Sequence, residues 1–221
     1  INSPNNPTGV LYSRQELQEL ARVLKAHSDK LGKAVYLISD DPYKKITFDG
    51  VEAPNIMEFY QDSIYITSHS KDIALPGERI GFLAVHPQCD SAGLLMAGLI
   101  FCNRVLGFVN APALIQRVVK QVQGVTVDVE QYRRKRDYLY NELTRIGYQV
   151  VKPQGAFYFF PKSPLEDEVE FVKKLADEKV LVVPGRGFGL PGYFRISYCL
   201  PDSVIEGSIA GFEKAYHECQ A

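Results

Sequence analysis

Two serines, a lysine and an arginine stand close together in the chain, in an arrangement suited to holding an anion beside an amine. The strand-like run 63–67 leads into Ser68, Ser70 and Lys71, and a Pro-Gly turn precedes Arg79. Serine hydroxyls and a guanidinium suit phosphate oxygens. A lysine with apolar neighbours and nearby cations can lose its proton and attack a carbonyl. The segment therefore predicts a Schiff base to a phosphorylated aldehyde, although a lysine after a strand is also commonly a solvated surface residue.

The elements that must position these groups alternate between strand and helix. A capping box at Ser13 opens an amphipathic helix predicted over 14–27, and apolar runs predict strands at 35–38, 64–67 and 82–85. Such alternation is typical of an α/β sheet, which binds ligands at the carboxyl ends of its strands. The polar side chains expected to converge there are Asn6, Asp40, Tyr43, Ser68 and Lys71.

The second half of the chain changes from long helices to short strands. Helices are predicted over 90–107, which is apolar nearly all round and expected to be buried or to contact another subunit, over 111–124 and over 128–146. Later segments indicate a smaller α+β domain, so the boundary is placed near residue 127. Its predicted strands are 148–151, 156–160, 180–183 and 194–198. Its predicted helices are 166–178 and one from 201 that carries Val204, Ile205, Ile209 and Phe212 on one face.

Composition and charge disfavour several classes of partner. The chain has 221 residues, 46% of them hydrophobic, and a net charge of -1, which gives no strong field to attract nucleic acid or an anionic membrane. The basic cluster 132–137 is expected to be a solvated helix face, opposite Tyr138, Leu139 and Leu143, which pack. Glycines and polar residues interrupt the apolar stretch 92–109, so a membrane span is not expected.

The cysteines indicate the redox compartment. Cys89, Cys102, Cys199 and Cys219 are scattered, without the paired spacing of a zinc or redox site, and no secretory signal opens the sequence. We therefore expect reduced thiols in a cytoplasmic protein, and no metal site.

Four short motifs follow one another along the chain: Asn-Asn-Pro-Thr-Gly at 5–9, Asp-Asp-Pro-Tyr at 40–43, Ser-His-Ser-Lys at 68–71 and Phe-Arg-Ile-Ser at 194–197. Their order and spacing resemble those of the class I/II aminotransferases, pyridoxal-phosphate enzymes of the aspartate aminotransferase fold (fold type I). The resemblance implies the C-terminal half of this α/β fold: a partial, mainly parallel sheet of the large cofactor-binding domain in 1–127, and the small α+β domain in 128–221. The chain opens without methionine, so an N-terminal part is expected to be missing.

The same resemblance implies the catalytic groups. Lys71 would hold pyridoxal 5'-phosphate as the internal aldimine and act as the proton shuttle. Asp40 would pair with the pyridinium nitrogen, and Tyr43 would hydrogen-bond the phenolic oxygen of the ring together with Asn6. Without the family, Asp40 is equally a helix cap, Tyr43 a core-edge residue and Asn6 a turn residue.

Further residues are implied as ligands. Ser68, Ser70 and Arg79 resemble the groups that bind the cofactor phosphate, and Arg195 resembles the arginine that grips the α-carboxylate of the substrate. Asn6 is also implied to bind the substrate. Two glycine-containing segments, 155–158 and 184–189, also match the small domain of the family, and the second is expected to be a turn near the substrate entrance. His69 is expected to be structural.

The implied activity is amino-group transfer between an amino acid and a 2-oxo acid in a homodimer. The motifs leave open a lyase acting by β-elimination or decarboxylation, because the cofactor supplies the electron sink and the pocket selects the bond that breaks. Ser68 and Lys71 also fit the Ser-x-x-Lys signature of penicillin-binding proteins, but the companion Lys-Thr-Gly motif is absent. A third alternative is a folded remnant that binds no cofactor.

Overall fold

The computed structural model describes residues 1–220, which divide into two compact units. The first unit comprises residues 1–4, 11–47 and 51–127, and the second comprises 5–10, 48–50 and 128–221. Two short segments that precede residue 127 thus belong to the second unit. The assignment of 1–127 and 128–221 to two domains of a larger protein stays a prediction.

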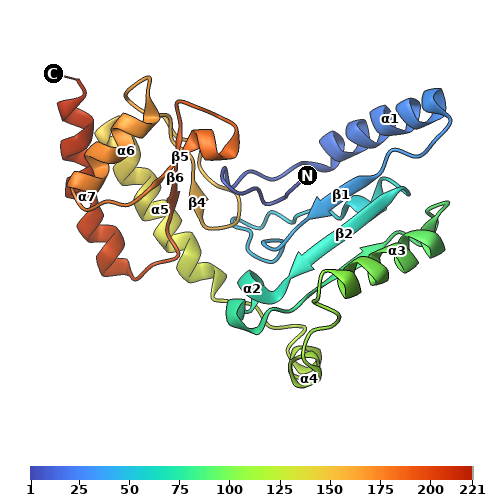
Figure 1. Ribbon diagram of the computed structural model, residues 1–221. Coiled ribbons are helices and arrows are strands. Elements are labelled where there is room, and N and C mark those ends of the chain that lie inside the picture. The colour runs from blue at the N-terminus through green and yellow to red at the C-terminus, as the bar shows by residue number, and fades with distance from the viewer. Residues whose placement is uncertain (221) are drawn as a thin grey trace. The chain divides into compact units, whose positions relative to one another are not determined.

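A three-stranded mixed sheet organises the first unit (Figure 1). Strand β1 (Leu37–Asp40) runs parallel to the central strand β2 (Ser63–Ser68), and β3 (Gly81–Val85) runs antiparallel to β2. The expected sheet was mainly parallel. Strand β3 is antiparallel because the connection from β2 contains the short helix α2 (His69–Asp72) and the 3-10 turn η2 (Pro76–Glu78), without the long crossover that a parallel pair needs.

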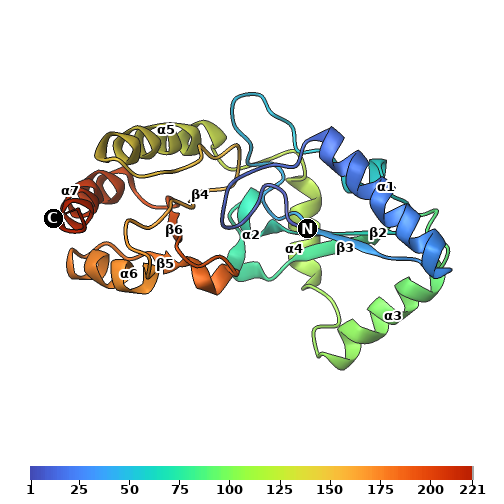
Figure 2. The same cartoon turned by 90° about the horizontal axis from the view of Figure 1, so that it is seen from above.

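Helix α1 (Arg14–Leu31) covers the sheet beside β1 (Figure 2). The Ser13 hydroxyl accepts from the Glu16 N–H, which confirms the capping box, and Gly32 ends the helix with a left-handed φ of 64°. The helix is four residues longer than predicted. Leu17 and Ala21 of α1 pack with Leu37 of β1, and with Ile56 and Tyr60 around the 3-10 turn η1 (Ile56–Glu58). Strand β1 itself begins two residues later than predicted.

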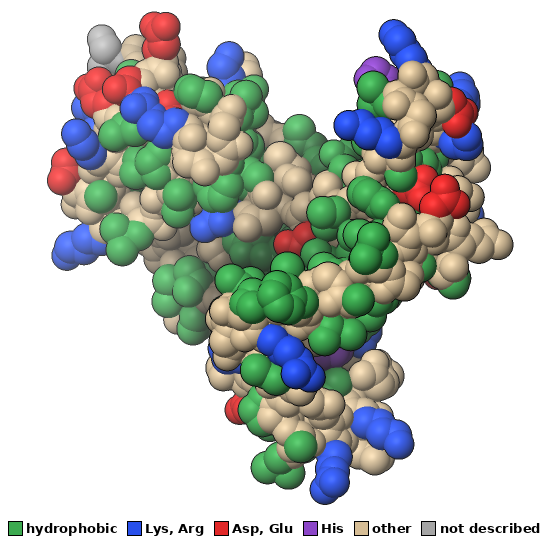
Figure 3. Space-filling model, turned by 45° about the vertical axis from the view of Figure 1, so that its right-hand side comes forward, with side chains coloured by type: hydrophobic (Ala, Val, Ile, Leu, Met, Phe, Trp, Pro, Cys, Tyr) green, Lys and Arg blue, Asp and Glu red, His purple; other side chains and the backbone are tan. Residues whose placement is uncertain are grey.

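Helices α3 (Ala92–Val105) and α4 (Ala113–Gln121) complete the first unit. The sequence predicted that this helix is buried or contacts another subunit. Burial is wrong for the described part of the chain, where none of the α3 side chains is buried, and a subunit contact stays a prediction. Leu94 is 77% exposed and Phe101 is 64% exposed, and Figure 3 shows hydrophobic side chains at the surface. The apolar sequence of α3 indicates that burial of its side chains would be favourable, but it does not show which surface would bury them. None of the helices in residues 1–220 has the length and apolar character of a membrane span.

The second unit packs three helices against a small antiparallel sheet of order β4-β6-β5 (Figure 1). The bounds are α5 Val129–Ile146, β4 Tyr158–Phe159, α6 Glu168–Asp177, β5 Val183–Pro184, the 3-10 turn η3 Gly185–Phe188, β6 Phe194–Ser197 and α7 Asp202–Glu218. The rings of Phe171, Phe194 and Phe212 surround Tyr148 in its core. The strand predicted at 148–151 is not formed. Of the apolar residues predicted on one face of α7, Ile205, Ile209 and Phe212 are buried, whereas Val204 is 50% exposed.

Helix α5 carries a buried cation within its basic cluster. The Arg136 side chain is 1% exposed and donates two hydrogen bonds to the Asp49 carboxylate, at 2.7 and 3.0 Å, and one to the Pro153 carbonyl at 3.1 Å. The expectation of a wholly solvated basic face is therefore wrong at Arg136. Tyr138, expected to pack, is 40% exposed, whereas Leu139 is buried as predicted. From its charge alone, Arg136 would be expected at the surface. It is buried because the Asp49 carboxylate, from a distant segment, pairs with it.

Replacing Arg136 should destabilise the protein. In Arg136→Ala the hydrogen bonds to Asp49 are lost and the Pro153 carbonyl loses a donor, so we expect the free energy of unfolding in urea to fall by about 2 kcal/mol. The control is Arg134→Ala, at an exposed position of the same helix, with a change within about 0.5 kcal/mol. Equal effects of both substitutions would contradict a structural role for Arg136.

Candidate active site

The junction between β2 and α2 holds the residues predicted to bind a phosphorylated aldehyde. Ser68 is the N-cap of α2, and its hydroxyl accepts from the Ser70 N–H at 3.1 Å. Ser68 is also the last residue of β2 to pair with β3, opposite Gly81. The His69 N–H donates to the Ile80 carbonyl at 3.0 Å, which continues this contact into α2. Because of this pairing, the residues that directly follow Arg79 lie beside the end of β2.

Gly81 allows this return because it has no side chain. A Cβ atom at residue 81 would lie 3.1 Å from the Ser68 Cα, a tight contact, and 2.4 Å from the Thr67 carbonyl oxygen, which is closer than Cβ atoms in proteins approach. Arg79 has a left-handed φ of 51°, and its Nη1 donates to the Pro76 carbonyl at 2.7 Å. The Arg79 side chain is exposed at this turn, so its guanidinium is accessible to an anion.

The carboxyl end of β1 lies beside the end of β2. Asp40 pairs with Ile66, the Asp41 N–H donates to the Ile66 carbonyl at 2.8 Å, and the Thr67 hydroxyl donates to the Asp41 carbonyl at 3.1 Å. Asp40 and Ser68 thus end neighbouring parallel strands at the same edge of the sheet, where ligands of α/β sheets bind.

The two neighbouring aspartates differ in their surroundings. Asp41 is buried, and its carboxylate accepts from the Ser39 hydroxyl at 2.8 Å and the Ser3 N–H at 3.1 Å, so its oxygens hold the local backbone. The Asp40 side chain is exposed, and desolvation raises the pKa of its carboxyl above the usual value, as it also does for Asp41. A bound cation beside Asp40 would offset that cost of ionisation, because an opposite charge favours the carboxylate. Because the Asp41 oxygens are already bonded within the protein and the Asp40 side chain is exposed, Asp40 is the better candidate partner for a protonated ring nitrogen.

Buried contacts fix helix α2, which carries Lys71. His69 and Asp72 are buried, and His69 Nδ1 lies 3.2 Å from a carboxylate oxygen of Asp72. The same oxygen pairs with Lys45 at 3.2 Å, and the Asp72 carbonyl accepts from Val127 at 2.8 Å. Lys71, between these anchored residues, is half-buried. Tyr43, the remaining predicted site residue of the first unit, is buried with 4% exposure.

The second unit contains Arg195, the residue predicted to bind the α-carboxylate of the substrate. Arg195 of β6 donates from Nη1 to the Asn6 side-chain oxygen at 3.0 Å. Its guanidinium carbon lies 4.8 Å from the centre of the Tyr158 ring and 4.7 Å from that of the Phe188 ring. The Arg195 Nε atom is buried and has no hydrogen-bond partner among the described residues. A buried unpaired N–H is costly, and a carboxylate would satisfy it.

A glycine-containing loop, residues 185–192, supplies Phe188 and depends on Glu168. The carboxylate of Glu168, which is fully buried on α6, accepts from Arg186 Nε at 2.8 Å, the Arg186 N–H at 3.1 Å and the Gly192 N–H at 3.0 Å. These hydrogen bonds, that of the Arg186 side chain first, lower the pKa of Glu168 to about 2. A Cβ at Gly185 would lie 2.4 Å from the Leu190 carbonyl oxygen, so the loop folds back tightly on itself.

Sequence reasoning missed the Asn6–Arg195 hydrogen bond and the role of Glu168. The first joins residues 189 positions apart, and no local pattern links them. Glu168 looks like an ordinary acid in the first turn of a helix. The motif containing Phe188 was recognised, but nothing in its spacing placed the ring against Arg195.

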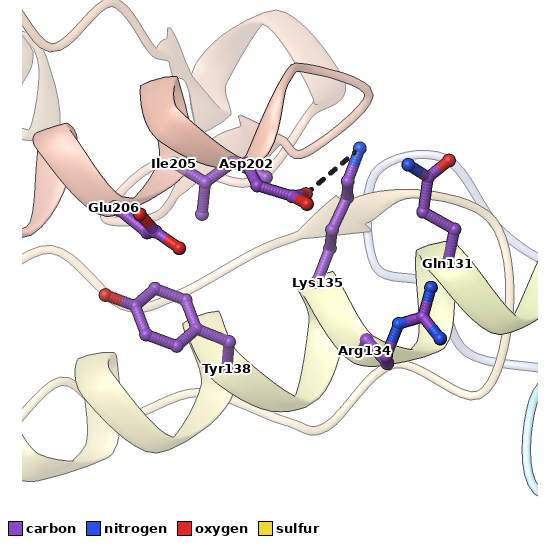
Figure 4. A pocket seen from close by; sticks show the side chains of 7 residues that line it. All are labelled: Gln131, Arg134, Lys135, Tyr138, Asp202, Ile205 and Glu206. Carbon is purple, nitrogen blue, oxygen red and sulfur yellow. Dashed lines mark ion pairs between the residues drawn. The ribbon is translucent and has the colours of Figure 1, made fainter.

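A separate cavity of about 200 Å³ lies between α5 and α7 and contains none of the predicted site residues within 1–220 (Figure 4). Lys135 pairs there with Asp202 at 3.5 Å and donates to the Leu200 carbonyl at 2.7 Å. The amine is therefore already bonded within the protein. The side chains that line the cavity are Gln131, Arg134, Lys135, Tyr138, Asp202, Ile205 and Glu206.

The fold and the motifs agree with comparisons to known proteins. The family model described as aminotransferase class I and II matches residues 1–210, so the chain belongs to this family, and the predicted family and α/β fold class are confirmed. A probable aspartate aminotransferase of Methanocaldococcus jannaschii is 34% identical over 95% of this chain and 56% of the relative.

Solved structures show the same partial match. An amino transferase from Eubacterium rectale is 41% identical with a TM-score of 0.96, over 100% of this chain and 56% of that one. An aspartate aminotransferase from Thermus thermophilus, solved with maleate, is 28% identical with a TM-score of 0.79, over 97% of this chain and 56% of that one. The chain thus spans about half the length of the curated relatives it matches.

Filling the close approach at Gly81 should disrupt the β2–β3 register. In Gly81→Ala the new Cβ must move away from the Thr67 carbonyl, so we expect the free energy of unfolding to fall by about 2 kcal/mol. Gly77→Ala in the same turn is the control, because a Cβ there would meet nothing within 4 Å. Urea unfolding of the intact protein measures both, and a neutral Gly81→Ala would refute the constraint.

The hydrogen bonds to Glu168 should make stability depend on pH. The folded pKa of about 2 lies below the usual 4.5, so the stabilisation from the charged carboxylate is complete above pH 4.5 and is lost as the pH falls towards 2. We expect the melting temperatures of wild type and Glu168→Gln to differ at neutral pH and to converge below pH 4.5. Glu170→Gln, at an exposed position of α6, should match wild type throughout. A constant gap for Glu168→Gln would contradict the linkage.

Proposed function

We propose that the intact protein transfers an amino group from an amino acid to a 2-oxo acid, with pyridoxal 5'-phosphate as cofactor. The observation that carries this proposal is the β2–α2 junction, where an amine and two hydroxyls follow a strand that ends beside Asp40. Membership of the aminotransferase family supports the reaction class. The curated relatives are about twice as long as the chain, so the proposal concerns the intact protein.

The residues present fit the cofactor by their chemistry. Hydroxyls of Ser68 and Ser70 and the exposed guanidinium of Arg79 would bind the phosphate, and Lys71 would bind the aldehyde carbon. Asp40, whose pKa is raised by desolvation, gains from a cationic ring nitrogen. When bound, the cofactor supplies the electron sink for the negative charge that develops at the substrate Cα.

The protein's own groups would then bind the substrate and move its proton. Lys71 Nζ would take the proton from the substrate Cα as a base and then, as an acid, give it to the aldehyde carbon of the cofactor. Arg195 would bind the α-carboxylate, because its buried Nε–H is a hydrogen-bond donor without an acceptor among the described residues. Asn6 orients Arg195 through their hydrogen bond, in addition to its role with Tyr43 at the ring oxygen of the cofactor.

The organisation of the intact protein is also part of the proposal. Residues 1–127 form the C-terminal portion of the large cofactor-binding domain and 128–221 the small domain. The protein acts as a cytoplasmic homodimer in amino acid metabolism. The exposed apolar side chains of α3 support contact with further polypeptide.

Cofactor capture by Lys71 tests the function. Pyridoxal phosphate added to the intact protein should give absorbance near the visible edge, and borohydride should fix an adduct on the peptide containing Lys71. Lys71→Ala should abolish the adduct and lower amino transfer by at least about 10³-fold, because a positioned acid–base group contributes on this order. Lys33→Ala, at an exposed position, is the control.

The alternatives predict different results. Ammonia release or decarboxylation that needs no 2-oxo acid would assign the protein to the lyases. Absence of both colour and adduct would identify a protein that does not bind the cofactor, and an adduct on a different lysine would refute the role of Lys71.

A further inference from the structure

We propose that Glu168 is a positioning residue for the carboxylate site: by holding loop 185–192, it keeps the Phe188 ring against the Arg195 guanidinium and thereby sets the affinity for substrate carboxylates. The inference rests on the proposed function, because it takes Arg195 as the carboxylate ligand. It adds a residue from α6 and a ring from the loop that the family motifs did not assign a role.

The rings restrict where the Arg195 guanidinium can lie. Both the Phe188 and Tyr158 ring centres are within 5 Å of its carbon, and Asn6 accepts from Nη1. A guanidinium stacked on aromatic rings keeps its in-plane N–H groups available for a carboxylate. The buried, unpaired Nε is one of these groups. Arg195 is therefore already oriented for a two-pronged contact before substrate arrives.

Phe188 also affects how strongly that contact binds. A ring beside the ion pair reduces its access to water, and charges attract more strongly where water is excluded. The Phe160 ring packs edge-on against Phe188, with centres 6.0 Å apart, and stacks on Tyr193 at 5.4 Å. The Phe188 ring is thus held by the Phe160 ring, which is itself packed against Tyr193.

Glu168 fixes the loop that carries this ring. Its carboxylate accepts hydrogen bonds from both ends of the loop, at Arg186 and at Gly192. Gly185 adds two backbone contacts, donating to the Tyr193 carbonyl at 2.7 Å and accepting from Leu190 at 3.1 Å. Phe188 lies between these anchors. A neutral amide at residue 168 would place an N–H group against the Arg186 donors, so it would loosen the loop without changing its length.

The test uses the intact protein loaded with pyridoxal phosphate, and maleate as the carboxylate probe. We expect Glu168→Gln and Phe188→Leu each to raise the maleate Kd and the amino acid KM by about tenfold, the size of a partly desolvated cation–ring contact, with kcat and the cofactor spectrum little changed. Phe188→Tyr, which keeps the ring, should restore the wild-type KM. Glu170→Gln, at an exposed position of α6, is the matched control.

The double variant Glu168→Gln/Phe188→Leu shows whether Glu168 acts through the ring. Its KM should equal that of Phe188→Leu alone, whereas independent roles would multiply the two effects. Multiplied effects, or a wild-type KM in Phe188→Leu, would overturn the inference. If Glu168→Gln does not fold, Arg186→Met takes its place, because it removes the side-chain donors to Glu168 and leaves the Arg186 and Gly192 N–H donors. A wild-type KM in Arg186→Met would then overturn the inference.

Arg195→Lys separates this inference from the proposed function. If Arg195→Lys leaves the maleate Kd unchanged, Arg195 is not the carboxylate ligand and the proposed substrate site fails. If Arg195→Lys weakens maleate binding and Phe188→Leu does not, the substrate site stands and only the role of the loop is refuted.

Discussion

The close approach of Gly81 to the end of β2 is the constraint on which the first unit's candidate site depends. The missing side chain lets β3 pair with Ser68 and lets the Ile80 carbonyl accept from His69. The strand contact therefore continues into the first turn of α2, and Lys71 follows two residues later. A helix this short has little stability of its own, so its position is set by these bonds and by the Asp72 pairings.

Local signals predicted the elements whose ends are determined by neighbouring residues. The capping box at Ser13 correctly predicted where α1 begins. Helix α5 begins after Asp128 and ends at Gly147, as the sequence pattern indicated. The same signals did not predict burial. Arg136 is inside because Asp49, from a distant segment, meets its charge, and α3 is exposed because nothing in the described chain covers it. Periodicity gives the face of a helix, whereas burial depends on its neighbours.

For the candidate site too, the sequence predicted residues within short motifs but not the contacts between distant segments. The short motifs named Lys71, Ser68, Ser70 and Arg195 as candidates because each motif is a contiguous run of residues, and the Pro-Gly turn named Arg79. Their roles stay predictions. The contacts that orient Arg195 were not found, because Asn6, Tyr158 and Phe188 come from three separate segments of the second unit. Sequence patterns thus indicated which residue types could do the chemistry, and the structure shows which neighbours hold one of them.

The two arginines illustrate how the surroundings of a cation suit it to different anions. Arg79 is exposed and anchored by one bond to the Pro76 carbonyl, so water screens its charge, and cooperation with neighbouring hydroxyls is needed to bind a phosphate firmly. Arg195 is held among rings and an amide with its buried Nε unpaired, so it loses little freedom when a carboxylate arrives, and its Nε gives up no water. A ligand that is exchanged in every catalytic cycle requires an orientation that persists between cycles. The hydrogen bonds of Glu168 to loop 185–192 give the proposed substrate site that persistence.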